Sequence, residues 1–313
     1  MRYRVTHRTE YRYSEPVDSG HNEARLLPRP LDRQQVLASS LAVDPPASDQ
    51  RERLDYFGNR VVAFSLDRPH RSLTVTSTSE VLVEPRVDGL DLFAGESWEQ
   101  VRGALRETTD PEGLMARDLS LASPLVPLGS ELAGYAAPSF TAGRPLLDAV
   151  HDLMMRIHRD FRYDPEFTTL STPLAEVLAH RRGVCQDFAH LAIGCLRTQG
   201  LAARYVSGYI ETLPPPGKPR LVGADASHAW FSVFVPDCGW VDFDPTNNQL
   251  PESRHITVAW GRDYADVTPL KGVIFGGGQM RLSVAVDVVD LDASALSPAT
   301  AATHAGTLPG ARA

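Results

Sequence analysis

The segment that most constrains the fold begins at Cys185, from which an amphipathic run continues without a break to Gly200. This run predicts a helix that carries the cysteine in its first turn. Three later segments, at 203–210, 228–235 and 240–244, are rich in β-branched and aromatic residues and predict strands. A helix followed by antiparallel strands indicates an α+β fold in which the cysteine helix packs on a sheet.

The rest of the chain divides by composition into four parts. Residues 1–85 predict a β-rich domain, and residues 86–142 predict a helical and irregular connecting region. Residues 143–290 form the main core with its C-terminal extension, whereas residues 291–313 have little apolar content to bury and predict a disordered tail. Outside the cysteine region, the predicted strands are 61–66, 73–83 and 280–289, and the predicted helices are 97–107, 111–117, 145–161 and 173–180.

Three side chains have the chemistry of an activated acyl-transfer nucleophile. Cys185 stands at a predicted helix start, where backbone N–H groups and the helix dipole favour the thiolate. His228 opens one predicted strand and Asp244 ends its neighbour, and paired strands lie about 5 Å apart, so the two side chains can meet. In such a set the thiolate attacks, the imidazole carries the proton and the carboxylate orients the imidazole. Asp242 lies on the same strand face as Asp244, and spacing alone does not choose between them.

Side chains near the thiol are candidates for supporting roles. The backbone N–H of Cys185 can donate to an oxyanion, and Tyr163 and Gln186 are the candidates for a second donor. Asp187 falls in the first turn of the helix, where complementing the dipole is favoured over contact with a substrate. Trp230, like Trp240, is expected in the core or in the wall of a cleft.

The other cysteines and histidines have simpler interpretations than catalysis. His190 lies about 500° around the helix from Cys185, which favours a core or supporting histidine. The spacing of His180, Cys185 and His190 matches no common zinc pattern, so no metal or cofactor is expected. Cys195 and Cys238 are expected to be small buried apolar side chains.

Composition limits the partners and the compartment. The chain has 31 basic and 39 acidic residues, a net charge of −8, and no long basic block. This argues against nucleic acid or an anionic membrane as a main partner. The first residues have no signal-peptide character, no stretch is long and apolar enough to span a bilayer, and three cysteines make no disulfide framework, so a cytoplasmic location is expected.

Four stretches around the proposed site are distinctive: RGVCQDFAH at 182–190, AARYVSGY at 202–209, SHAW at 227–230 and GWVDFDPT at 239–246. They closely resemble the bacterial transglutaminase-like superfamily, which has a papain-like core. Further stretches resemble the β-rich domain that precedes this core and the usual end of the same architecture: YRY at 11–13, LLPR at 26–29, DYFGN at 55–59, PH at 69–70, GRDYADV at 261–267 and GGG at 276–278. The resemblance implies a papain-like transglutaminase core after a β-rich N-terminal domain, with Cys185, His228 and Asp244 as the catalytic triad.

The resemblance implies a cysteine enzyme that acts on amide bonds of a peptide or protein substrate. Hydrolysis is expected if water accepts the acyl group, and transamidation if an amine does. A non-catalytic module that binds a peptide in the papain-like groove is the alternative. The proline-rich stretch at 211–220 immediately precedes His228, so it is expected to be an exposed loop that borders the cleft. The oligomeric state is not indicated.

Overall fold

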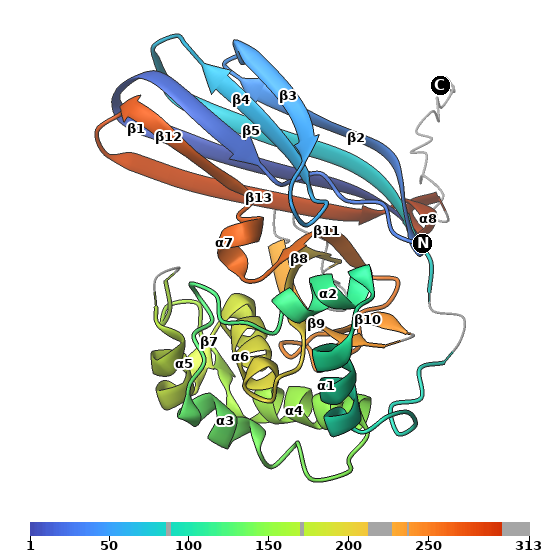
Figure 1. The fold of residues 1–313 in the computed structure, drawn as a ribbon. Helices are drawn as coiled ribbons and strands as arrows, with labels where there is room; N and C mark the ends of the chain where they lie inside the picture. The colour runs from blue at the N-terminus through green and yellow to red at the C-terminus, as the bar shows by residue number, and fades with distance from the viewer. Residues whose placement is uncertain (86–88, 170–171, 212–226, 237, 296–313) are drawn as a thin grey trace, which may run out of the picture.

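The computed structural model describes residues 1–85, 89–169, 172–211, 227–236 and 238–295. Within these ranges the chain forms a β-rich unit and a mixed unit of helices and strands, which pack against each other (Figure 1). None of the helices in these ranges has the length and apolarity needed to cross a bilayer. From residue 212 onward, the predicted loop at 211–220 lies outside the described residues, so its position beside the cleft stays a prediction.

The β-rich unit is a seven-stranded sheet built around one long strand, β1 (Arg2–Ala24). The first half of β1 pairs with β5 (His70–Val83) and β13 (Met280–Asp290). Its second half pairs with β4 (Arg60–Leu66) and β12 (Leu270–Gly276). The sheet is extended by two further strands, β2 (Gln34–Asp44) beside β5 and β3 (Asp49–Leu54) beside β4.

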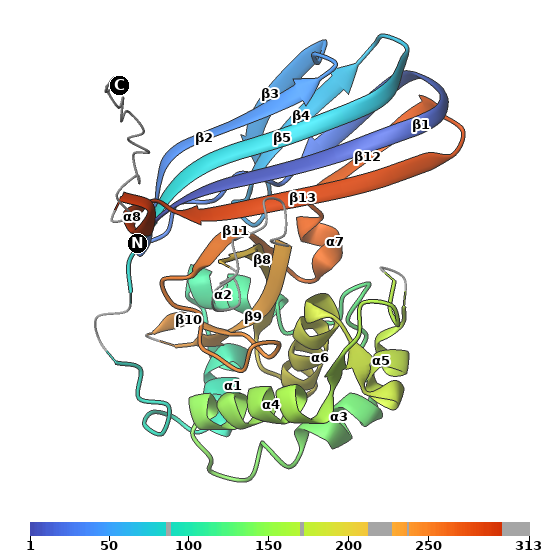
Figure 2. The same ribbon diagram turned by 180° about the vertical axis from the view of Figure 1, so that it is seen from behind.

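The C-terminal strands belong to this N-terminal sheet. From the sequence, we attached residues up to 290 to the core as its extension, but β12 and β13 hydrogen bond to β1 in antiparallel register. The β-rich unit is therefore built from both ends of the described chain, as Figure 2 shows from behind. The predicted disordered tail also needs a correction, because Leu291–Ala295 form the short helix α8. Residues 296–313 lie outside the described ranges.

The mixed unit places the cysteine helix against a four-stranded antiparallel sheet with the order β10-β9-β8-β11. Helix α6 (Cys185–Thr198) packs on the two central strands of this sheet. The strands are β8 (Ala203–Ile210), β9 (Ser227–Val235), β10 (Gly239–Phe243) and β11 (His255–Gly261). The other helices are α1 (Trp98–Glu107), α2 (Pro111–Asp118), α3 (Ser130–Ala136), α4 (Leu146–Asp160), α5 (Leu174–His180) and α7 (Tyr264–Val267), and the two-residue strands β6 (Arg162–Tyr163) and β7 (Arg182–Gly183) pair in parallel.

These results confirm the predicted α+β class, and the predicted helices and strands end within three residues of the observed ones. Local chemistry explains the agreement. Ser97 caps α1, because its hydroxyl accepts the N–H of Gln100 while the Gln100 side chain accepts the N–H of Ser97. The Asp110 side chain caps α2 by accepting the N–H of Gly113 at 3.0 Å, with Pro111 as the first helical residue.

The two units share one hydrophobic core, and polar anchors fix strand β11 to the β-rich unit. Val286 and Val288 of β13 are fully buried in the same cluster as Ile256 of β11. The Gln34 side-chain amide donates to the carbonyl of Thr257 at 2.7 Å and accepts the N–H of Thr257 at 2.8 Å. The β-rich unit therefore holds in place the strand that begins at His255.

Candidate active site

The start of α6 is held by a buried carboxylate. The Oδ2 atom of Asp187 accepts the N–H of Val184 at 2.8 Å and the hydroxyl of Thr168 at 2.9 Å. Burial raises the pKa of Asp187 despite these hydrogen bonds. Gly183 is required at its position, because a Cβ atom there would lie 2.8 Å from that of Asp187. Asp187 thus fixes the turn that presents Cys185, in agreement with its interpretation as a helix-start residue.

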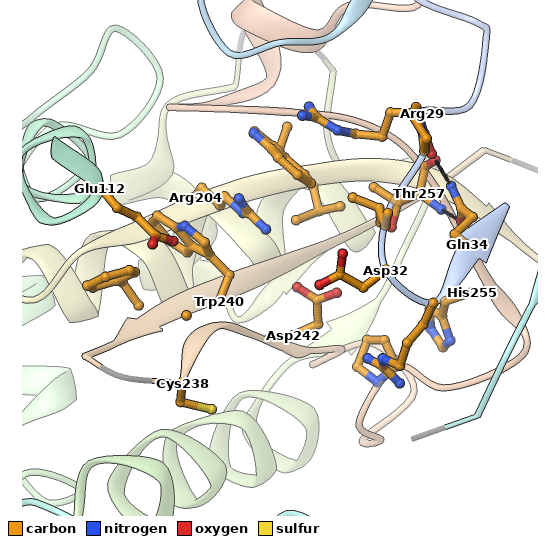
Figure 3. Close-up of a pocket in the computed structure, with 18 of the residues that line it drawn as sticks. Arg29, Asp32, Gln34, Glu112, Arg204, Cys238, Trp240, Asp242, His255 and Thr257 are labelled. Atoms are coloured by element: carbon orange, nitrogen blue, oxygen red, sulfur yellow. Dashed lines mark hydrogen bonds between the residues drawn. The ribbon is translucent and has the colours of Figure 1, made fainter. Parts of the chain in front are cut away.

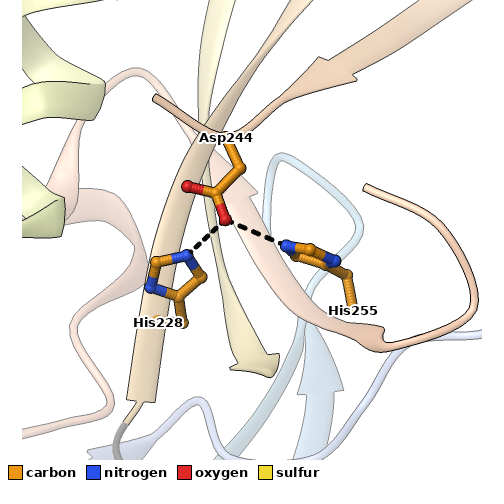
Figure 4. A group of neighbouring side chains, drawn as sticks. All are labelled: His228, Asp244 and His255. Carbon is orange, nitrogen blue, oxygen red and sulfur yellow. Dashed lines mark hydrogen bonds and ion pairs between the residues drawn. The ribbon is translucent and has the colours of Figure 1, made fainter. Parts of the chain in front are cut away.

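His228 and Asp244 meet where the strands of the small sheet end. His228 lies near the beginning of β9 and Asp244 directly follows β10, and the Nε2 atom of His228 donates to Oδ2 of Asp244 at 2.8 Å (Figure 4). Burial alone would lower the pKa of His228, but hydrogen bonds and charge interactions with Asp244 and Cys185 raise it to about 10. Cys185 itself is half-buried. The structure therefore brings together the three side chains predicted as a triad.

The structure also distinguishes the two candidate aspartates. Asp244 is fully buried, and its Oδ1 atom accepts the backbone N–H groups of Thr246 at 3.0 Å and Asn247 at 3.2 Å. Burial alone would raise the pKa of Asp244, but hydrogen bonds led by that of His228 hold it well below its ordinary value. Asp242 instead accepts a hydrogen bond from the hydroxyl of Ser232. Asp244 is thus the carboxylate that contacts His228.

Two polar residues of this site were missed from the sequence. The Nε2 atom of His255 lies 3.1 Å from Oδ2 of Asp244, so two imidazoles share one carboxylate oxygen (Figure 4). The side-chain amide of Asn247 donates to the same oxygen at 2.8 Å. Asn247 directly follows the DPT stretch at 244–246, so its position in the sequence could have indicated its role. His255 gave no local signal, because only the pairing of β11 with β8 brings it to the site.

The three side chains predicted for supporting roles differ in burial and in their contacts. Tyr163 is half-exposed, with its ring edge-to-face against Phe188 of α6, and burial followed by a charge interaction with Cys185 raises its pKa. Gln186 is half-buried in the first turn of α6. Trp230 is fully buried, with its ring edge-to-face against His255 at 5.1 Å between centroids. Trp230 therefore belongs to the core behind the site, as expected.

A metal ion would have one set of ligands in the described residues. The ligand atoms of His228, Asp244 and His255 all lie within 4.8 Å of one another. Two imidazoles and a carboxylate suit zinc, but the separations of 2.8 and 3.1 Å from the carboxylate oxygen are those of hydrogen bonds. His180 and His190 make other contacts, to the Glu176 carbonyl and the Tyr264 N–H respectively.

A cavity of about 990 Å³ lies between the small sheet and the β-rich unit (Figure 3). Its lining includes Arg29, Arg204, Trp240, Asp242 and His255, but neither Cys185 nor His228. The Cys185 thiol therefore lies outside the lining of this cavity, whereas His255 both lines the cavity and contacts Asp244.

The remaining cysteines differ from each other. Cys195 is fully buried in α6, as expected, and burial raises its pKa to about 12. Cys238 is exposed in the connection between β9 and β10, so the prediction that it is buried was wrong. A short hairpin connection places its side chains outside the layer that the sheet and helix bury, which explains the exposure.

Two buried histidines predict that the protein loses stability in acid. His190 accepts the Tyr264 N–H at 3.1 Å, and His7 lies 3.0 Å from the Tyr209 hydroxyl at the contact of the two units. Burial lowers the pKa of each to about 4 from an ordinary value of 6.5. As pH falls from 6.5 to 4, the unfolded chain takes up these protons and the folded chain does not, so each histidine removes up to about 3 kcal/mol. Urea unfolding of the wild type and of His7→Gln and His190→Gln between pH 7 and 4 measures this loss, which must be smaller in each variant.

Comparisons with known proteins agree with this geometry. Residues 3–82 match the bacterial transglutaminase-like N-terminal region, and residues 135–245 match the transglutaminase-like superfamily. An uncharacterized protein of Mycobacterium tuberculosis is 46% identical over 302 residues, which cover 94% of this chain and 95% of that protein. An uncharacterized protein of Mycobacterium leprae is 34% identical, with 93% and 99% covered.

Two further comparisons reach proteins with assigned names. A protein-glutamine gamma-glutamyltransferase of Pseudomonas aeruginosa is 30% identical over 164 residues, half of this chain and 23% of that protein. A solved structure from Cytophaga hutchinsonii, provisionally assigned as a cysteine protease, superposes with a TM-score of 0.72 at 20% identity, with 93% of this chain and 91% of that chain covered. At this identity the superposition shows a common fold.

Proposed function

Because this chain belongs to the bacterial transglutaminase-like superfamily, we propose that it is a cysteine-dependent enzyme that cleaves peptide, isopeptide or related amide bonds. Cys185 is the proposed nucleophile, His228 the proton carrier and Asp244 the group that orients the imidazole. One observation carries the proposal. In a buried site, the His228 imidazole interacts with the Cys185 thiol on one side and the Asp244 carboxylate on the other.

The reaction follows from the protonation state of this pair. With a pKa raised to about 10, His228 holds a proton at neutral pH, as a thiolate–imidazolium pair requires. The Cys185 thiolate attacks the carbonyl carbon, and the electron pair of the C=O bond moves to the oxygen. When this adduct collapses, the C–N bond breaks and His228 gives its proton to the leaving amine, which leaves a thioester on Cys185.

Deacylation reverses these roles. The neutral imidazole of His228 takes a proton from water as the water attacks the thioester, and the acid product leaves while the thiolate–imidazolium pair is restored. If an amine attacks in place of water, a new amide forms. The name of the Pseudomonas relative supports a test of both acceptors.

Two donors are proposed for the negative oxygen of the adduct. The backbone N–H of Cys185 lies in the first turn of α6, where N–H groups have no helical partner. Tyr163 is proposed as the second donor because a charge interaction links its phenol to Cys185 and its ring packs on Phe188 of the same helix. Gln186 remains the other candidate.

The proposal predicts amide chemistry that depends on Cys185. The purified protein and its Cys185→Ala variant are incubated with a mixed peptide library, with and without a labelled primary amine, and the products are read by mass spectrometry. New termini or conversion of Gln to Glu in the wild type alone would establish hydrolysis through Cys185. Incorporation of the label in the wild type alone would establish transamidation.

A Cys238→Ser variant is the matched control, because Cys238 is an exposed thiol outside the site. Its product spectrum is expected to equal that of the wild type. Identical spectra for wild type and Cys185→Ala would count against an amide-cleaving enzyme and favour the alternative, a peptide-binding module.

A further inference from the structure

The carboxylate that orients His228 is shared with a second imidazole. Oδ2 of Asp244 accepts from Nε2 of His228 at 2.8 Å and lies 3.1 Å from Nε2 of His255. All three side chains are buried, with exposed fractions of 8% for His228, 0% for Asp244 and 5% for His255. In a triad of thiol, imidazole and carboxylate, His255 has no assigned role.

The chemistry of the acceptor determines which ring nitrogen of His255 carries the hydrogen. Asp244 is ionised, because its pKa is held well below the ordinary value, and an ionised carboxylate only accepts hydrogen bonds. The Nε2 atom of His255 therefore carries the hydrogen. Its Nδ1 atom is buried and has no partner among the described residues. A second hydrogen on Nδ1 would place a positive charge there without an acceptor, which burial opposes.

The two imidazoles thus have different surroundings on one oxygen. His228 also interacts with the Cys185 thiol, whereas the other ring nitrogen of His255 has no partner among the described residues. A second hydrogen-bond donor draws electron density from the carboxylate and lessens its attraction for an imidazolium on His228. An imidazolium that is held too tightly is a poor acid for the leaving amine, because proton transfer is efficient when the donor pKa lies near the working pH.

We propose that His255 is a positioning residue that holds the Asp244 carboxylate and limits its stabilisation of the His228 imidazolium. The inference rests on the proposed function, in which His228 carries the proton. His255 contacts neither the thiol nor the substrate in this scheme, and it acts through Asp244.

Within the described part of the chain, few other groups are available for this role. The titratable groups there that face His228 are Cys185 from α6, Asp244 after β10 and His255 from β11. From β9 itself the neighbour is the uncharged Trp230, 6.0 Å away between ring centroids. The residue opposite His228 on β8 is Gly208, which has no side chain. Asn247 is the other side-chain donor to the shared oxygen, and it does not titrate.

The test is a direct titration of His228, without a substrate. Protein with isotope-labelled histidine is prepared in the Cys185→Ala background, so that the thiol does not titrate with the imidazole, and the His228 signal is assigned from its absence in His228→Gln. In His255→Phe, which keeps a ring but removes the donor, the pKa of His228 should rise by half a unit or more. In His255→Gln, whose amide can donate to Asp244, it should lie closer to the parent value.

A matched control separates positioning from packing. His7→Phe also removes a buried, hydrogen-bonded histidine, but His7 contacts Tyr209 and Thr9 instead of the triad. It should lower the melting temperature and leave the pKa of His228 unchanged. If His255→Phe does not fold, His255→Leu replaces it.

The inference would be overturned by an unchanged or lowered pKa of His228 in the variant without a donor, or by an equal rise in His7→Phe. These outcomes do not depend on turnover. A protein that cleaves no amide would still give an interpretable titration of His228. An unchanged pKa of His228 would count against the role of His255 and would not affect the result of the peptide assay.

Discussion

Replacing His228 by alanine should slow the reaction of Cys185 with iodoacetamide at pH 6 by on the order of 10²-fold. Only the thiolate reacts, and an ordinary thiol with a pKa of about 8.5 is almost wholly protonated at pH 6. In the proposed ion pair the proton resides on His228, because Asp244 and Cys185 raise the pKa of His228 to about 10. Without the imidazole, the thiol has to lose its proton to water. The measurement is the rate of adduct formation by mass spectrometry from pH 5 to 9.

The structure determines how this experiment is designed. Cys238 is exposed and would react on its own, so the measurement is made in a Cys238→Ser background. Cys195 is expected not to react with iodoacetamide, because it is fully buried and burial raises its pKa to about 12. Asp244→Asn is the companion variant. It keeps the shape of the carboxylate but removes the charge that holds the imidazolium, so it should lose part of the reactivity at pH 6.

A wild-type rate that rises only above pH 8, or a His228→Ala rate equal to that of the wild type at pH 6, would show that the two side chains form no ion pair. Cys185 would then be an ordinary thiol. The peptide-binding alternative would be favoured.

Replacing Gly208 by alanine should destabilise the protein by about 3 kcal/mol or more, as overpacking between two strands does. A Cβ atom at Gly208 would press on the carbonyl oxygen of Ile256 in β11 and lie 2.6 Å from Cη2 of Trp230. Neither neighbour yields easily, since one is backbone and the other is a fully buried ring. The movement would displace β11, which begins at His255.

Urea unfolding measures this effect, and Gly103→Ala is the matched control. Gly103 lies within α1, and a Cβ atom there meets nothing within 4 Å. Alanine in a helix interior is favoured over glycine by about 1 kcal/mol, so this control should be stabilised. A loss below about 1 kcal/mol for Gly208→Ala would show that β8 and β11 separate more readily than their contact suggests.

Most helices and strands of the mixed unit were predicted from the sequence because their signals are local, whereas α3, α7 and β11 were missed. Helix α6 follows from apolar spacing over neighbouring turns, and α1 follows from a cap and its partner three residues later. The contact between His228 and Asp244 was also predictable from the sequence. His228 lies on β9 and Asp244 directly follows β10, and a short connection joins these two strands, so the proximity of the two side chains needs only a hairpin.

The sequence by itself thus determined the α+β class, the family resemblance and which residues make up the proposed triad. Only the tertiary structure decided that β12 and β13 complete the N-terminal sheet and that His255 shares the Asp244 carboxylate oxygen with His228. The physical reason is the distance along the chain over which each kind of interaction acts. Periodicity and capping act over a few residues, whereas strand partners distant in the chain are selected by the burial of whole faces and by register. His255 reaches Asp244 because β11 pairs with β8 and the β-rich unit anchors that strand through Gln34.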